Sequence, residues 1–181
     1  MNSAIIVIDM LNRYEHEDAE PLRESVRQIV PHLSSLIHQA RERDLPVVYV
    51  NDNHQDWTAG RRELVQKALE GADPGLVEPI VPPDDAPFVV KARHSVFYGT
   101  QLEYMLRHLD VDRLVLTGQV TEQCILYSAL DAYVRHFSVV VAPDACAHID
   151  ADLAQAALRM MESNMRAEIL DAGSVCDAVA A

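Results

Sequence analysis

The chain has 181 residues, of which 49% are hydrophobic, and this suits one domain spanning residues 1–181. Asp and Glu outnumber Lys and Arg by 28 to 15, which gives a formal net charge of −13. A surface this acidic repels nucleic acids and anionic membranes, so we expect neither as a partner.

The N-terminal apolar segment is too short to cross a membrane. It ends at Asp9, far short of the ~20 apolar residues that a span requires, and no basic stretch precedes it. We therefore expect a cytoplasmic, reducing location. The three cysteines, Cys124, Cys146 and Cys176, form no CxxC pair, which argues against disulfides and against a structural zinc site.

Short apolar runs alternate with helical patterns along the chain. The first run, Ala4–Asp9, is continuous, as is typical of a buried parallel strand. Apolar residues then recur at helical spacing from Val26 to Ala40, and Pro31 lies inside this pattern, where a helix should start or bend. In chain order there follow strand Pro46–Asp52, helix 61–70, strand Phe88–Lys91, helix Thr100–Leu109, strand Arg113–Gly118, helix Thr121–His136, strand Ser138–Ala142, helix Asp152–Asn164 and strand Ala167–Leu170.

This alternation predicts an α/β fold, a doubly wound parallel sheet of six strands between two layers of helices. The stretch Gly71–Pro87, rich in Pro, Gly and Asp, should be a loop, and disorder is expected only for Cys176–Ala181. Active sites in such folds lie beyond the carboxyl ends of the strands. Asp9, Lys91 and Cys124 all lie at or just past predicted strand ends, so we expect them to meet there.

Cys124 falls in the first turn of a predicted helix. Unpaired backbone N–H groups and the helix dipole favour a thiolate at such a place, and they can also hold the oxyanion of acyl transfer. The alternative is a core thiol, the usual fate of a free cysteine. That alternative suits Cys146 better, since it follows the strand Ser138–Ala142 without such a turn.

Asp9 and Lys91 each end an apolar strand. A buried carboxylate needs a partner, so Asp9 is either a structural ion pair or cap, or a general base that takes a thiol proton. Lys91 is either a solvated surface lysine or an ammonium that stabilises a thiolate and holds the carboxylate. Both functional interpretations gain weight when the two residues are considered together with Cys124.

At this point the sequence resembles the isochorismatase-like cysteine hydrolases, which include nicotinamidases and carbamoylsarcosine amidases. The resemblance covers almost the whole chain through AIIVIDMLN, YVND, KARHSVFYGTQLE, LVLTGQVTEQCILYSALDA and VVVAPDACA. It implies a Rossmann-like sheet of order 3-2-1-4-5-6, a catalytic triad of Asp9, Lys91 and Cys124, and a homodimer or homotetramer. It also implies a cis peptide bond at Gln119–Val120 and an oxyanion hole formed by the backbone N–H groups of Val120 and Cys124.

Departures from the family pattern bear on the substrate. Nicotinamidases bind a metal through an Asp-x-His pair and a further histidine; Asp52 and His54 match the pair, but residues 55–93 contain no histidine. We therefore expect no metal and no cofactor, with Asp52 and His54 as the partial alternative site. The residues that we expect to line the substrate pocket are Asn12, Tyr14, His54, Trp57, Tyr98 and Gln119.

Taken together, these features predict a cysteine hydrolase that cleaves a small amide or carbamoyl substrate through a thioester. One alternative is an enol-ether hydrolase of the isochorismatase kind, and another is a catalytically silent protein that holds a metabolite in the same pocket. The intact set of Asp9, Lys91 and Cys124 favours the hydrolase of C–N bonds.

Overall fold

The structure, a computed structural model, describes residues 2–179, and six parallel strands form its sheet in the order β3-β2-β1-β4-β5-β6. The strands are β1 (Ser3–Ile8), β2 (Val47–Asp52), β3 (Phe88–Lys91), β4 (Arg113–Gln119), β5 (Ser138–Ala147) and β6 (Glu168–Ile169). The predicted fold class and strand order are confirmed.

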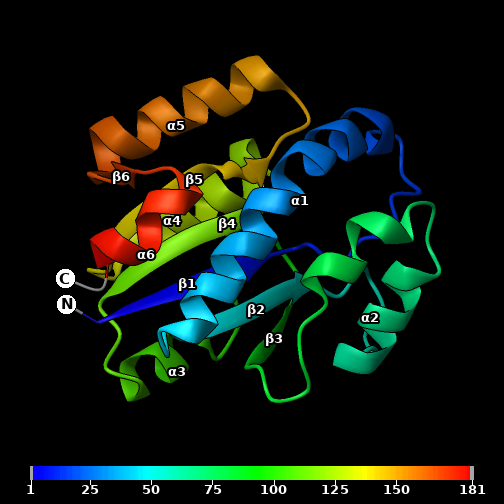
Figure 1. The fold of residues 1–181 in the computed structure, drawn as a ribbon, viewed down its shortest axis with the longest axis horizontal. Coiled ribbons are helices and arrows are strands. Elements are labelled where there is room, and N and C mark those ends of the chain that lie inside the picture. Colours follow the sequence, from blue (N-terminus) through cyan, green and yellow to red (C-terminus); the bar gives the residue numbers. More distant parts are fainter. Residues whose placement is uncertain (1, 180–181) are drawn as a thin grey trace.

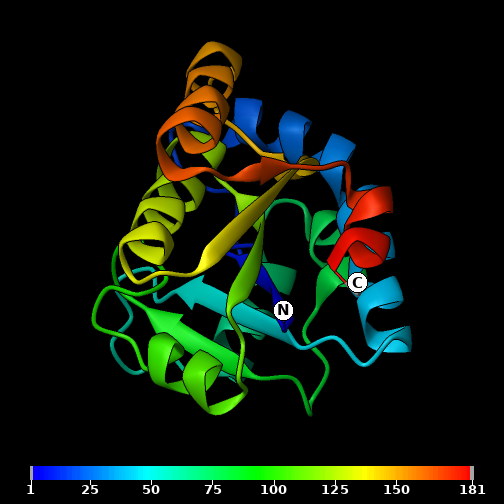
Figure 2. The ribbon, with the colours of Figure 1, turned by 90° about the vertical axis from the view of Figure 1, so that its left-hand side faces the viewer.

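Helices cover both faces of the sheet (Figures 1 and 2). One face is covered by α1 (Ala19–Glu42), α2 (Arg61–Leu69) and α6 (Ala172–Val179), and the other by α3 (Leu102–His108), α4 (Leu126–Val134) and α5 (Ala151–Met165). Two short 3₁₀ turns, η1 (Pro74–Leu76) and η2 (Glu78–Ile80), lie between α2 and β3, and a π-helical turn, η3 (Thr121–Ile125), leads into α4.

The sequence of strand β1 is apolar from Ala4 to Ile8 because the strand is buried on both faces of the sheet. Ile5 and Val7 pack into the core below α1, whereas Ala4, Ile6 and Ile8 pack into the core below α3 and α4. Alternate side chains of a strand point to opposite faces, so a strand that is covered on both faces needs apolar residues at every position. The run can end only at the sheet edge, where Asp9 follows.

Pro31 lies in the middle of one continuous helix, α1, so the expectation that a helix starts there is wrong. A proline inside a helix costs about 3 kcal/mol, because a backbone hydrogen bond is lost. The cost is offset by the apolar face of α1, which is buried against the sheet on both sides of Pro31, from Leu22 to Ala40.

The C-terminal segment departs from the prediction of disorder, because Cys176–Val179 belong to α6; residues 180–181 lie outside the described part of the chain. Four buried residues share one face of this helix at helical spacing: Ala172, Val175, Cys176 and Val179. Helix α6 packs against α1 in the front of Figure 1. Among residues 2–179, no helix is long and apolar enough to cross a membrane.

Candidate active site

The first side chain of the site, Asp9, follows β1 at the carboxyl edge of the sheet. Its backbone has a φ of 57°, a left-handed conformation that turns the chain away from the strand direction. One carboxylate oxygen, Oδ1, accepts a hydrogen bond of 2.8 Å from the backbone N–H of Asp52. The other oxygen, Oδ2, lies 2.8 Å from Lys91 Nζ. Asp9 is therefore a buried carboxylate with both oxygens engaged.

Lys91, the last residue of β3, has a side chain that is fully buried. Its ammonium lies 2.8 Å from Asp9, 3.5 Å from Asp52 Oδ2 and 4.0 Å from Cys124 Sγ. Burial by itself lowers the pKa of Lys91, but the negative charges of the Asp9 and Asp52 carboxylates oppose it, and the pKa is raised above its ordinary value. Lys91 is thus a buried cation, and the interpretation as a solvated surface lysine is wrong.

Cys124 lies in the π-helical turn η3, between β4 and α4. Such turns occur often at functional sites. Burial and the nearby carboxylate of Asp9 raise the pKa of the Cys124 thiol, while Lys91 and the backbone N–H of Val120 lower it by a smaller amount. Burial and Asp9 therefore oppose the effect of the helix start, which the sequence predicts to favour a thiolate. A protonated thiol beside a carboxylate can pass its proton to that carboxylate during attack.

A hydrogen-bonded chain supports Asp9 from the adjacent strand. The Gln119 side chain donates from Nε2 to the backbone carbonyl of Asp9 at 2.6 Å, and its Oε1 accepts from the Tyr14 hydroxyl at 3.4 Å. The peptide bond between Gln119 and Val120 is cis. Gln119 and Tyr14 are each 2% exposed, so they support Asp9 from the buried interior and do not form an open wall of a pocket.

The other predicted pocket residues lie in the segments that follow β1, β2 and β3. Asn12 is half-buried and accepts a hydrogen bond from the backbone N–H of Tyr14 at 2.7 Å. Trp57 is 80% exposed and Tyr98 is 65% exposed, so neither side chain encloses a pocket within this chain.

Asp52 and His54, the partial metal site that the sequence leaves as an alternative, are engaged in other contacts. His54 Nε2 lies 3.0 Å from the carbonyl oxygen of Leu11, a contact that is a hydrogen bond when this nitrogen carries the ring proton. The Asp52 carboxylate accepts from the backbone N–H of His54 at 2.8 Å and also faces Lys91. Within residues 2–179, no group of three or more His, Cys, Asp or Glu side chains is placed to hold a metal ion.

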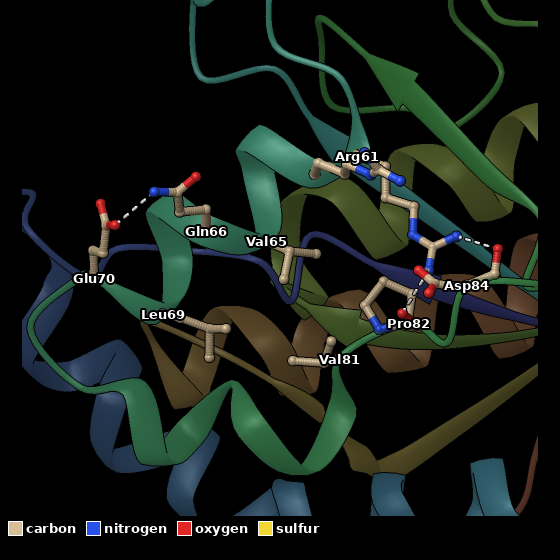
Figure 3. Close-up of a pocket in the computed structure, with 9 residues that line it drawn as sticks. Arg61, Val65, Gln66, Leu69, Glu70, Val81, Pro82 and Asp84 are labelled. Carbon is tan, nitrogen blue, oxygen red and sulfur yellow. Dashed lines mark hydrogen bonds and ion pairs between the residues drawn. The ribbon is translucent and has the colours of Figure 1, made fainter.

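A separate cavity of about 370 Å³ lies between α2 and the segment 81–84 (Figure 3). Its floor is apolar, formed by Val65, Leu69 and Val81, and Arg61 closes one end by pairing with Asp84. The lining of this cavity contains none of the predicted site residues. The chemistry-bearing residues are therefore at the sheet edge and not in this cavity.

The sequence patterns indicate no role for one residue that lies near the sulfur. His94, in the loop after β3, places Nδ1 at 3.7 Å from Cys124 Sγ, and its ring meets Tyr127 edge-on at 5.3 Å between centroids. The sequence pattern indicates only a possible metal ligand at Asp52, whereas in the structure Asp52 contacts Lys91. The only sequence feature that indicates the contact between His94 and Cys124 is the position of His94, three residues after Lys91 at the end of a predicted strand.

Comparisons with known proteins agree with this fold, and the regions that match include all of the site residues described above. The family model for the isochorismatase domain matches residues 3–174. An uncharacterized isochorismatase family protein of Bacillus subtilis, YaaI, is 33% identical over 168 residues, which cover 93% of each chain. An isochorismatase family protein from Desulfovibrio vulgaris has a solved structure that gives a TM-score of 0.80 at 27% identity, covering 99% of both chains. The structure of N-carbamoylsarcosine amidase from Thermoplasma acidophilum gives a TM-score of 0.74 at 27% identity, covering 95% of this chain and 97% of that one.

Proposed function

Because this chain belongs to the isochorismatase family of hydrolases, we propose that it is a cysteine hydrolase of a small amide or carbamoyl substrate. One observation carries the proposal: Lys91 Nζ lies 2.8 Å from Asp9 and 4.0 Å from Cys124 Sγ in a buried cluster. A nucleophile, a base and a cation that orients them form the arrangement that covalent catalysis requires. The similarity to an N-carbamoylsarcosine amidase supports a C–N bond as the target.

The proposed reaction begins with the transfer of the thiol proton from Cys124 to the Asp9 carboxylate. The thiolate attacks the carbonyl carbon, and the backbone N–H groups of Val120 and Cys124 hold the oxyanion. Asp9 then protonates the leaving nitrogen, the C–N bond breaks, and a thioester remains on Cys124. Water hydrolyses the thioester, which releases the acid and restores the thiol. Lys91 stays charged throughout and stabilises both the thiolate and the ionised Asp9.

A panel of small primary amides, ureas and N-carbamoyl compounds tests this proposal. We expect ammonia or amine release, with an acyl adduct on Cys124 in the intact mass spectrum. Cys124→Ala should abolish both signals, because the nucleophile is lost. Cys176→Ala is the matched control, since Cys176 lies in α6, which packs against α1 and β5 and contributes no residue to the site described above; it should retain activity. Product release that survives Cys124→Ala would contradict the proposal.

Location and assembly are two further parts of the proposal. We propose a cytoplasmic protein, and its three free cysteines suit a reducing compartment. We also propose a homodimer or homotetramer. Exposed apolar side chains at Tyr127, Leu130 and Val134 share one face of α4, which would be suitable for contact with a second copy. Light scattering that finds a monomer at micromolar concentration would contradict the assembly.

A further inference from the structure

The sulfur of Cys124 has buried neighbours on one side and an exposed neighbour on the other. Asp9 and Lys91 approach it from the buried interior of the sheet edge, where they are 7% and 2% exposed. His94 approaches from the loop after β3 with Nδ1 at 3.7 Å, and its own residue is exposed. The edge-on contact with Tyr127 of α4 limits how the imidazole ring can turn. His94 therefore lies on the solvent-exposed side of the sulfur.

Two other ionisable groups lie near the sulfur, and both are on its inner side. Asp9 Oδ2 is paired with Lys91, and its Oδ1 accepts from the backbone N–H of Asp52. Lys91 is held as a cation by its carboxylate neighbours and has no lone pair to offer. The imidazole is the remaining base within reach of the sulfur that the structure places on the open side.

We propose that His94 is the general base of the second half-reaction, the hydrolysis of the Cys124 thioester. This inference rests on the proposed function. With the ring proton on Nε2, the lone pair on Nδ1 accepts a proton from water as the hydroxide oxygen attacks the thioester carbonyl. The C–S bond then breaks, the acid leaves, and the imidazolium returns its proton to the thiolate. Atoms and charges balance without a cofactor.

The probe that tests the step is p-nitrophenyl acetate, which acetylates a reactive cysteine whatever the natural substrate is. His94→Gln keeps a polar side chain without an imidazole base. We expect kcat to fall by about 10²-fold, the usual contribution of a general base, while kcat/KM stays within about twofold. Acetyl-Cys124 should accumulate in the mass spectrum, because acylation still proceeds. Added hydroxylamine, a strong nucleophile that needs no base, should restore turnover.

Two further variants separate catalysis from structure. Tyr127→Ala removes the ring that limits the imidazole, so kcat should fall by a smaller factor and acetyl-enzyme should again accumulate. His108→Gln, an exposed histidine of α3, should behave as the wild type. A purely structural role for His94 would lower kcat/KM and kcat together, and an unchanged kcat would equally overturn the inference. Failure of the proposed function gives a different result: no acetylation of the wild type, or acetylation that survives Cys124→Ala.

Discussion

At the scale of single residues, the reactivity of Cys124 depends on opposing contributions from its neighbours. Burial and the Asp9 carboxylate raise the pKa of its thiol, and Lys91 lowers it. In the proposed mechanism Asp9 has two effects, because its charge adds to burial in raising the pKa of the thiol and its carboxylate takes the thiol proton. A substitution of Asp9 should consequently separate two properties that usually change together, thiol ionisation and catalysis.

Asp9→Asn should make Cys124 react faster with iodoacetamide and yet abolish hydrolysis. The neutral amide removes a charge that raises the thiol pKa, while Lys91 remains. A fall of one pKa unit increases the thiolate fraction about 10-fold, so we expect alkylation to accelerate by about that factor near neutral pH. Peptide mass spectrometry after timed alkylation measures the rate at Cys124.

The matched control for this substitution is Asp52→Asn, which removes a carboxylate 3.5 Å from Lys91 that does not act directly on the thiol. Its effect on alkylation should be smaller than that of Asp9→Asn. Slower alkylation in Asp9→Asn than in the wild type would show that Asp9 does not raise the thiol pKa, and would contradict this account of the site.

The neighbours of Cys124 could be predicted from the sequence only where the sheet determines their position. Parallel strands end at one edge, so Asp9 and Lys91 had to approach the turn that follows β4. His94 lies in a loop, and its approach to the sulfur depends on how that loop turns back towards α4. The exposure of Trp57 and Tyr98 has the same origin, because no periodicity predicts where a loop side chain points.

At the scale of elements, the close contact of β1 and β4 beside the site depends on a single glycine. Gly118 has a φ of +107°, and a Cβ at this position would lie 2.1 Å from the carbonyl oxygen of Ile8. It pairs with Ile8 in the β1–β4 register and directly precedes Gln119. The register shift between β4 and β5 lies between Leu116 and Gly118. A side chain here would push apart the strand ends that carry Asp9 and Gln119.

Gly118→Ala should lower the free energy of unfolding by about 3 kcal/mol or more, since the backbone strain and the clash with β1 add together. Gly173→Ala is the control. A Cβ at Gly173 meets nothing within 4 Å, and its place in α6 should make alanine stabilising by about 0.5–1 kcal/mol. Urea denaturation measures both variants. Equal stability of the two would contradict the role assigned to Gly118.

The lengths of the elements were less predictable than their order. Strand β5 extends to Ala147, beyond the predicted end at Ala142, because a bulge lets it resume pairing with β4 through Cys146 and Ala147. The helix that contains Cys124 begins as a π-helical turn, which apolar spacing does not distinguish from an α-helix. Helix α6 was missed because eight residues containing Gly and Ser form a helix here only by packing on α1.

At the scale of the whole molecule, buried neutral acids should make the fold sensitive to alkali. Burial raises the pKa of the Cys146 thiol above its ordinary value of 9.0. Burial also raises the pKa of the Tyr14 phenol, although the hydrogen bond to Gln119 opposes it. At a pH above the ordinary pKa values of the thiol and the phenol, the unfolded chain loses these protons while the folded chain keeps them. The unfolded state then binds fewer protons, so the free energy of unfolding falls as the pH rises.

We therefore expect the free energy of unfolding to fall above about pH 9, with a slope of up to about 1.4 kcal/mol per pH unit for each such group. Cys146→Ala removes one group. Its stability should be lower at neutral pH, because a buried sulfur that donates to the Leu116 carbonyl is lost, but its alkaline slope should be shallower. Tyr104→Phe, at a residue that is 79% exposed, should keep the wild-type slope. Urea denaturation at several alkaline pH values measures the three slopes. An identical slope in Cys146→Ala and the wild type would mean that the thiol ionises as readily in the folded chain as in the unfolded one.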